Sequence, residues 1–257
     1  MNEWSKRAPR RWIAMALAAV LAGALAGCGG QDATRDRLQA GSPDGILAEA
    51  QRQVRLGAYS SAIDLYNALE IRYPFSEQNR EGQLGLMYAY KKDRQSEAAL
   101  EAADKFIREN PRHPRVDYAY YMRGLAFYPE GMGPVERLFR VQNTERPQDD
   151  ARRAFDNFAV FLNRFEDSQW APDARQRMIH LRNALAGFEL HVAKYYMTRK
   201  AYIAAANRAK RVVTEYQGTD AVDDALDVMT KAYRKLGLDD LAQDAERVRQ
   251  ENSRGSN

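Results

Sequence analysis

The residue with the clearest chemistry in this sequence is Cys28, the only cysteine among 257 residues. A cysteine thiolate is a nucleophile, and the small residues Ala26 and Gly27 leave room at the sulfur for acylating and cleaving enzymes. The stretch Leu25-Ala26-Gly27-Cys28 looks like a lipobox, where bacterial lipoproteins receive diacylglycerol. The sequence therefore predicts lipidation at Cys28. The alternative is an ordinary signal peptide that ends near a cysteine.

The residues before Cys28 have the order of a secretory signal. Four basic residues, Lys6, Arg7, Arg10 and Arg11, precede an apolar run from Trp12 to Leu25. A run of about 14 residues is too short to cross about 30 Å of hydrocarbon as an anchor, but it suits a signal peptide. We predict a signal peptide over residues 1–27. Acylation of the single cysteine then leaves no thiol for a disulfide.

The residue after the cysteine bears on localisation. It is Gly29 and not aspartate, which resembles lipoproteins that Gram-negative cells transfer to the outer membrane. The expected location is thus the periplasmic face of the outer membrane, through a lipid anchor. No cofactor is expected apart from the covalent diacylglycerol and N-acyl lipid on Cys28.

The three histidines do not form a metal site in the sequence pattern. His113 stands between two prolines and is predicted to be a turn residue. His180 and His191 share a predicted helix face but are separated by about 16 Å at 1.5 Å per residue. One metal ion cannot bind both, and no H-x-x-x-H or C-x-x-C spacing occurs. No metal is therefore expected.

Catalytic motifs are also missing from the sequence, which contains no G-x-S-x-G, S-x-x-K or P-loop pattern. The acidic pairs Asp149/Asp150 and Asp223/Asp224 are predicted to begin helices, where carboxylates favour the positive end of the dipole. A glycosidase would need two carboxylates in a cleft, and the sequence leaves such a pair open. Because the repeats described below leave no room for a catalytic domain, we predict that the chain is not an enzyme.

Charge gives no sign of a nucleic-acid partner. Removal of residues 1–27 deletes four basic residues and Glu3, so 35 basic and 34 acidic residues remain. Nucleic-acid binding would need a net basic face. The local cluster of Arg208, Lys210 and Arg211 is interpreted as a solvated helix face or a protein contact.

The mature chain is predicted to have three parts. Residues 28–45 are the lipidated N-terminus and a flexible tether, because they are polar and lack apolar periodicity. Residues 46–250 have a nearly continuous helical pattern, and residues 251–257 are predicted to be a disordered tail.

A repeat within residues 46–250 carries the fold prediction. Gly57, Tyr59, Ala62, Tyr66, Leu69 and Pro74 have the order of the second half of a tetratricopeptide (TPR) unit: turn glycine, aromatic, small residue, large residue, closing proline. The same spacing recurs four times. The later copies are Arg94, Ser96, Ala99, Ala103, Phe106 and Pro111; Ala151, Ala154, Phe158, Phe161 and Glu166; Tyr202, Ala205, Ala209, Val212 and Gln217; and Leu238, Leu241, Ala245 and Val248.

The copies begin 37, 55, 51 and 36 residues apart, so two intervals contain extra residues. The second holds a Gly/Pro-containing insertion at about 128–146, and the third holds a long predicted helix at about 173–198. We expect an all-α superhelix (solenoid) of about five TPR-like helical hairpins, in which each hairpin buries its apolar face on its neighbours. The long helix is expected to brace the two halves.

Aromatic residues are dense in the third and fourth hairpins. They are Tyr118, Tyr120, Tyr121, Phe127 and Tyr128, and then Tyr195, Tyr196 and Tyr202. Most are predicted to be packing residues, and the remainder to line a concave binding groove, since tyrosine offers large contact area at low entropic cost.

Beyond these patterns, the chain resembles the BamD family of lipoproteins of the β-barrel assembly machinery over residues 46 to 250. The matching stretches are Arg72-Tyr73-Pro74-Phe75; Phe106-Ile107-Arg108 before Asn110-Pro111 and His113-Pro114; Asp117-Tyr118; Tyr121-Met122-Arg123-Gly124-Leu125; Arg146-Pro147-Gln148 before Ala151-Arg152; Val192-Ala193 before Tyr195-Tyr196; and Asn207-Arg208. The pair Lys200-Ala201 departs from the family's common turn residues.

The resemblance implies a non-catalytic scaffold that binds the POTRA domain of BamA, the lipoproteins BamC and BamE, and unfolded outer-membrane β-barrel proteins. It places Tyr73 in the substrate-facing N-terminal region, and Arg208, with Tyr195, Tyr196 and Tyr202, on the BamA side. The alternative for Tyr73 is a packing residue that closes the hairpin. The alternative for Arg208 is a surface cation with an intramolecular partner.

Two other functions stay open at this point. One is a TPR lipoprotein for type IV pilus or secretin assembly, and the other is an enzyme or enzyme adaptor of cell-wall turnover. The insertion at 129–146 and the Arg-Tyr-Pro-Phe stretch argue against the pilus function. Because no ATP is available in the periplasm, any work must come from binding and conformational change. We hypothesise that substrate binding at the N-terminal half alters the C-terminal half through the long helix.

Overall fold

The computed structural model describes residues 41–129 and 146–255, and every regular element in these ranges is an α-helix. The predicted all-α class is confirmed. Cys28, the signal peptide and residues 130–145 of the insertion lie outside the described residues. Within the described residues, no helix is both long enough and apolar enough to cross a membrane.

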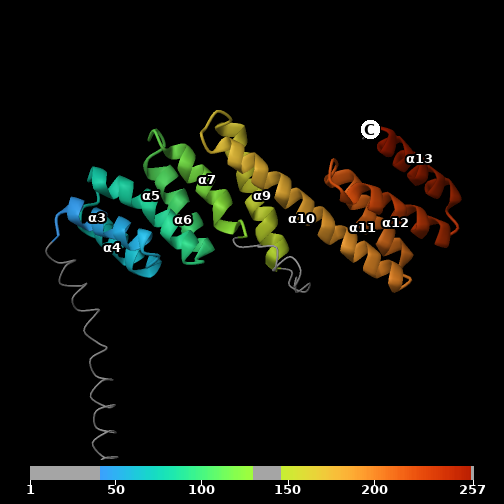
Figure 1. Cartoon of the computed structure of the whole chain (residues 1–257), viewed down its shortest axis with the longest axis horizontal. Coiled ribbons are helices and arrows are strands. Elements are labelled where there is room, and N and C mark those ends of the chain that lie inside the picture. The colour runs from blue at the N-terminus through green and yellow to red at the C-terminus, as the bar shows by residue number, and fades with distance from the viewer. Residues whose placement is uncertain (1–40, 130–145, 256–257) are drawn as a thin grey trace, which may run out of the picture. The chain divides into compact units, whose positions relative to one another are not determined.

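The helices form two compact units, one ending at Ala89 and the other beginning at Tyr90. The first contains α3 (Pro43–Arg55), α4 (Tyr59–Arg72) and most of α5 (Glu77–Lys92). The second contains α6 (Ser96–Glu109), α7 (Val116–Phe127), α9 (Arg146–Arg164), α10 (Ala171–Thr198), α11 (Tyr202–Glu215), α12 (Ala221–Lys235) and α13 (Asp239–Gly255). Figure 1 shows α11, α12 and α13 side by side in chain order, and α11–α12 and α12–α13 are packed pairs.

Helix α3 begins earlier than predicted, at Pro43 and not at Ile46. The Ser42 hydroxyl accepts a hydrogen bond from the backbone N–H of Gly45 at 3.2 Å. Pro43 occupies the first turn, where its missing N–H costs nothing, and Asp44 favours the positive end of the dipole. The predicted tether to residue 45 is thus too long, because Ser-Pro-Asp starts the helix before the apolar periodicity begins.

The repeat spacing identifies the buried positions of four of the five copies. The small residues Ala62, Ala99, Ala154 and Ala205 have no exposed surface. The two positions that follow are buried in each copy as well. They are Tyr66 and Leu69, Ala103 and Phe106, Phe158 and Phe161, and Ala209 and Val212. The period of 3, 4 and 3 therefore marks the face that each helix turns toward its neighbours.

One backbone conformation recurs before four of the repeat helices. Gly57, Arg94, Lys200 and Gly237 have φ of 76°, 61°, 59° and 72°, the left-handed region, two residues before the helix begins. Lys200 therefore adopts the turn that glycine makes elsewhere, at a cost of about 1–2 kcal/mol for a residue with a Cβ. Lys200-Ala201 differs from the family's common turn residues, but Lys200 keeps the left-handed backbone conformation of this turn.

This turn shows that the fifth copy begins one residue later than predicted. Gly237 corresponds to Gly57, so Ala242, which is 2% exposed, takes the small position, whereas Leu241 is 46% exposed. The apolar spacing of Leu238, Leu241, Ala245 and Val248 imitates the repeat, although three of these four residues are exposed.

Helix α13 has a charged surface. In the corrected alignment Glu246 and Arg249 take the large apolar positions, where they form an ion pair at 3.0 Å, and Arg249 also reaches Asp227 of α12 at 3.5 Å. The helix continues to Gly255, past residue 250, so the predicted disordered tail from 251 is wrong for most of its length. Glutamate, glutamine and arginine are good helix formers, and no glycine or proline interrupts the segment before Gly255.

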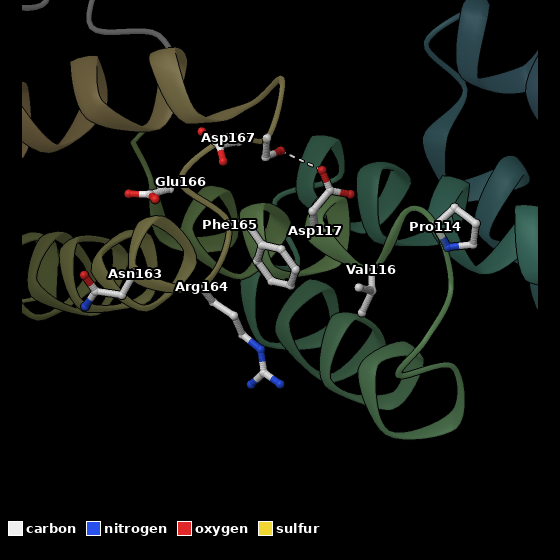
Figure 2. Close-up of a pocket in the computed structure, with 9 residues that line it drawn as sticks. Pro114, Val116, Asp117, Asn163, Arg164, Phe165, Glu166 and Asp167 are labelled. Atoms are coloured by element: carbon white, nitrogen blue, oxygen red, sulfur yellow. Dashed lines mark hydrogen bonds between the residues drawn. The ribbon is translucent and has the colours of Figure 1, made fainter.

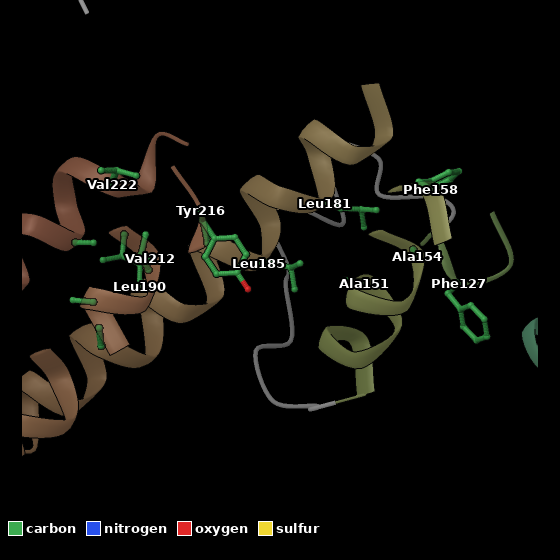
Figure 3. Close-up of a cluster of buried hydrophobic side chains, with 14 of the residues drawn as sticks. Phe127, Ala151, Ala154, Phe158, Leu181, Leu185, Leu190, Val212, Tyr216 and Val222 are labelled. Atoms are coloured by element: carbon green, nitrogen blue, oxygen red, sulfur yellow. The ribbon is translucent and has the colours of Figure 1, made fainter. Parts of the chain in front are cut away.

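The long helix α10 has 28 residues and confirms the predicted helix at 173–198. It packs against α9, α11 and α12 within the second unit. Its side chains join the cores on both sides, as shown by Leu185, which lies between Ala154 of α9 and Val212 of α11 (Figure 3). The parts that the long helix α10 connects are thus α9 on one side and α11 with α12 on the other.

The aromatic residues of the third hairpin pack, as most were predicted to do. Tyr120, Tyr121 and Phe127 are each at most 8% exposed. The Tyr121 ring stacks on Trp170 with centroids 5.1 Å apart. Its hydroxyl donates a hydrogen bond to Asp173, which also accepts one from Arg177. Burial disfavours the charged form of Asp173, but the hydrogen bonds from Arg177 and Tyr121 outweigh it and lower its pKa.

Helix α7 approaches α9 closely at Gly124. A Cβ atom on Gly124 would lie 2.4 Å from Cδ1 of the buried Phe158 ring. Phe158 is fully buried, so the ring has little space to move. This contact explains why the third hairpin has glycine at this position.

Gly124→Ala is expected to lower the free energy of unfolding by about 1–3 kcal/mol, because the added methyl overpacks the Phe158 contact. The matched control is Gly187→Ala on α10, where no atom lies within 4 Å of the added Cβ. That variant is expected to be stabilised by up to about 1 kcal/mol, since alanine is the better helix former. Urea unfolding monitored by circular dichroism measures the stability of both variants. Equal changes in the two would contradict a steric effect of the Gly124–Phe158 contact.

Asp173→Asn tests the tyrosine network through pH. Because the folded pKa lies below the ordinary 3.8, the carboxylate stabilises the fold fully at neutral pH, and this contribution is lost as pH falls below about 3.8. We expect a loss of up to about 1 kcal/mol at pH 7 that shrinks toward pH 2, because solvent screens a carboxylate that is 45% exposed. Asp223→Asn, at an exposed position of α12, is the control. If the difference in unfolding free energy between the natural chain and Asp173→Asn stayed constant down to pH 2, the charge of the carboxylate would not be the source of the stabilisation.

Candidate partner-binding site

The residues predicted for partner binding gather where α10 meets α11. Glu189 of α10 is only 1% exposed and is surrounded by three guanidinium groups. Arg208 of α11 binds one carboxylate oxygen at 2.7 Å, and Arg152 of α9 and Arg211 of α11 bind the other at 3.1 and 3.3 Å. One buried carboxylate thus connects three helices.

The structure gives Arg208 an intramolecular partner, as the alternative interpretation expected. Its partner is Glu189, yet about a third of the Arg208 side chain is exposed. Arg211 also binds Glu215 at 3.0 Å, and this hydrogen bond raises the pKa of Arg211. Three cations and two carboxylates leave one excess positive charge at this place.

A pocket of about 350 Å³ opens beside this cluster. Its lining consists of Tyr196, Ala204, Asn207, Arg208 and Arg211. The pocket offers an aromatic surface, an amide and two guanidinium groups, which suit a carboxylate or a backbone carbonyl of a partner.

The tyrosines near the pocket differ in exposure. Tyr195 is 54% exposed at the C-terminal end of α10, and its ring lies 6.0 Å from that of Tyr196. Tyr196 and Tyr202 are partly buried and pack against the core. The apolar surface continues at Ile203, which is 66% exposed. Two exposed apolar side chains thus neighbour lining residues in the sequence, Tyr195 beside Tyr196 and Ile203 beside Ala204.

Tyr73 lies in the first unit, where α4 ends. It is partly exposed, and its hydroxyl donates a hydrogen bond to the carbonyl oxygen of Gly41 at 3.3 Å. Its carbonyl accepts hydrogen bonds from the N–H and the hydroxyl of Ser76, which closes the turn to α5. These contacts fit the alternative of a residue that closes the hairpin.

A second pocket, of about 490 Å³, lies where α7 begins and α9 ends (Figure 2). Asp117 accepts hydrogen bonds from the Ser168 hydroxyl at 2.6 Å and the Tyr118 N–H at 2.8 Å, so this carboxylate closes a turn. Glu166 and Asp167 of the lining are exposed to water. The pocket therefore lacks the desolvated carboxylate that general acid catalysis usually uses.

Among the described residues, no group of three or more histidine, cysteine or acidic side chains is arranged to hold a metal ion. The Nδ1 of His113 accepts a hydrogen bond from the N–H of Arg115 at 3.1 Å, as a turn residue would. His180 lies 6.2 Å from the Tyr128 ring, and His191 is exposed.

The role of Glu189 did not emerge from the sequence, although a signal is present there. Leu185, Ala186, Leu190 and Ala193 form the apolar stripe of α10, and Glu189 falls inside that stripe. A charge at an apolar position indicates a buried carboxylate with cationic partners. The spacing of α10 alone could not identify those partners, since they come from α9 and α11.

Glu189→Gln is expected to lower the free energy of unfolding by about 2–3 kcal/mol. The loss stays below that of a fully buried ion pair because the three arginines keep contact with water. Asp224→Asn is the control, since it removes only the exposed pair with Lys194, worth at most about 1 kcal/mol. Denaturant unfolding measures both variants, and a Glu189→Gln loss no larger than the control would contradict the central role of this carboxylate.

Comparison with known proteins agrees with the resemblance noted in the sequence. Residues 39–248 match the family YfiO, described as outer membrane lipoprotein. A Neisseria meningitidis protein named outer membrane protein assembly factor BamD is 42% identical over 211 residues, which are 82% of this chain and 79% of that protein. BamD of Vibrio cholerae is 34% identical over 82% of this chain and 87% of its own length. BamD of Haemophilus influenzae is 33% identical over 93% and 90%.

These matches extend over both compact units and include the cluster around Glu189. The chain therefore belongs to the YfiO family of outer membrane lipoproteins, the family of the outer membrane protein assembly factors BamD.

Proposed function

We propose that this chain is a non-catalytic, lipid-anchored scaffold on the periplasmic face of the outer membrane. It binds the BamA POTRA domain, the lipoproteins BamC and BamE, and unfolded β-barrel proteins on their way into the membrane. Membership of the BamD family supports the role in outer-membrane protein assembly. The partners and their sites are part of the proposal.

The observation that carries the BamA-side contact is the pocket beside Glu189. The exposed Tyr195 and Ile203 neighbour the lining residues Tyr196 and Ala204 in the sequence. The cluster of three arginines and two carboxylates, which includes Arg208 and Arg211, has one excess positive charge. Protein interfaces commonly have this composition, in which aromatic and arginine side chains contribute most of the binding energy. We infer that BamA presents a carboxylate to Arg208 and an apolar side chain to Tyr195.

The N-terminal hairpins are the proposed contact for unfolded barrel proteins. Tyr73 is partly exposed and lies in the Arg-Tyr-Pro-Phe stretch. Its hydroxyl is engaged with Gly41, so any substrate contact uses the face of the ring. An extended strand with alternating aromatic residues would match such a surface.

Capture of partners tests the proposed BamA contact. The lipidated chain, tagged at its C-terminus, is used to recover proteins from detergent-solubilised outer membrane. Arg208→Gln is expected to reduce recovery of the BamA barrel protein about tenfold, the effect of losing one hot-spot contact of about 1.4 kcal/mol. Charge reversal at Arg208 is less informative, because it would place a second carboxylate beside Glu189.

Arg247→Gln is the matched control, since Arg247 is an exposed arginine on α13 whose partner is Asp244 of the same helix. It should leave recovery unchanged. Thermal unfolding of each variant verifies that the fold is intact. Equal recovery with both variants would overturn the Arg208 contact. Recovery of pilus secretin in place of BamA would support the pilus function.

A further inference from the structure

Two large apolar side chains of the first hairpin are almost completely exposed. Ile71 is 81% exposed and Phe75 is 91% exposed, the highest values among the large hydrophobic residues that the structure describes. They lie four residues apart, at the end of α4 and in the turn to α5. We propose that this Ile71–Phe75 surface contacts the lipid surface to which Cys28 is anchored. The inference rests on the lipid anchor of the proposed function.

The core of the hairpin does not need these two side chains. Leu69, on the same helix as Ile71, is fully buried, and it fills the space beside Gly82 of α5. Ile71 follows two positions later and therefore points away from that buried face. Phe75 comes after Pro74, outside the helix. Both side chains are thus available for a contact outside the hairpin.

The course of the chain brings this surface close to the anchor. The Tyr73 hydroxyl binds the Gly41 carbonyl at 3.3 Å, and the Gln78 side chain donates a hydrogen bond to Asp44 at 2.8 Å. The start of α3 is therefore fastened to the turn that contains Phe75. Only 13 residue steps separate Cys28 from Gly41, and even a fully extended chain of this length spans at most about 45 Å.

The opposite end of the hairpin lies one helix length away from Gly41. α3 has 13 residues and is therefore about 20 Å long. Leu56 at that far end is another exposed apolar residue, at 65%. Leu56 therefore lies about one helix length farther from the attachment point at Gly41 than the turn that contains Phe75 does. Leu56 at one end of the hairpin therefore serves as the control for Ile71 and Phe75 at the other end.

The chemistry of the Ile71–Phe75 surface suits the boundary between headgroups and acyl chains. Aromatic and aliphatic side chains enter that boundary to a depth of about 5–10 Å. Arg72 is exposed between Ile71 and Tyr73, and its stem can lie along apolar groups while its charge stays with the phosphates. Two side chains bind lipid weakly by themselves, but the anchor raises their effective concentration at the bilayer.

A depth measurement with fluorescent labels tests the inference. The lipidated full chain is prepared as Phe75→Cys, Ile71→Cys and Leu56→Cys, each labelled at the new thiol because the natural one is acylated. Each is reconstituted in phosphatidylethanolamine and phosphatidylglycerol vesicles, with and without doxyl-labelled lipid. The labels at 71 and 75 are expected to shift to shorter wavelength and to lose about half of their emission to the quencher, whereas the label at 56 does neither.

Emission at 75 and 71 equal to that at 56 would overturn the inference. So would a change at 75 that follows addition of a barrel-protein C-terminal peptide and not the quencher, since the surface would then belong to substrate. Mass spectrometry of the N-terminal fragment separates this inference from the proposed function. If the chain carries lipid but its labels are not quenched, only the lipid contact of the Ile71–Phe75 surface is overturned. If Cys28 carries no lipid, both this contact and the lipid anchor of the proposed function are overturned.

Discussion

Small residues at the helix contacts are the constraint on which the packing depends. The alanines at 62, 99, 154 and 205 are completely buried, and Gly85 and Gly124 each accommodate an aromatic ring from a neighbouring helix. A larger residue at these places would push the helices apart, and each hairpin would lose the surface that covers its apolar face. With a single cysteine in the chain, no intramolecular disulfide can compensate for such a loss.

Glu189 joins stability and recognition in one cluster. A buried carboxylate needs cationic partners, and its three arginines come from helices on both sides of α10. Two of these arginines also line the pocket proposed for BamA. A substitution at Arg208 therefore acts on the packing of α10 against α11 and on the surface together. A binding defect at this position is informative only beside a measurement of folding.

The helical hairpins are predictable from the sequence because burial repeats with a fixed period. The spacing alone locates Ala62, Ala99, Ala154 and Ala205, and the apolar pattern locates the long helix α10. The prediction for the fifth copy is wrong because Leu238, Leu241 and Val248 have the right spacing on the wrong face. The partners of Glu189 and the contact of Tyr73 with Gly41 are not predictable in this way, since they depend on which separate segments meet. Family resemblance indicates Arg208, but only geometry reveals its intramolecular partner.

The ion pairs on α13 have a consequence for how such a chain could change in length during evolution. An array built from similar hairpins can gain a unit by duplication wherever both new faces are apolar. Glu246 and Arg249 occupy the positions that a following hairpin would have to cover, and Arg249 is also held by Asp227. A duplicated hairpin added after α13 would have to desolvate these ion pairs, whereas one inserted between earlier hairpins would meet apolar faces. The charged surface of α13 thus disfavours the stacking of a further hairpin on it.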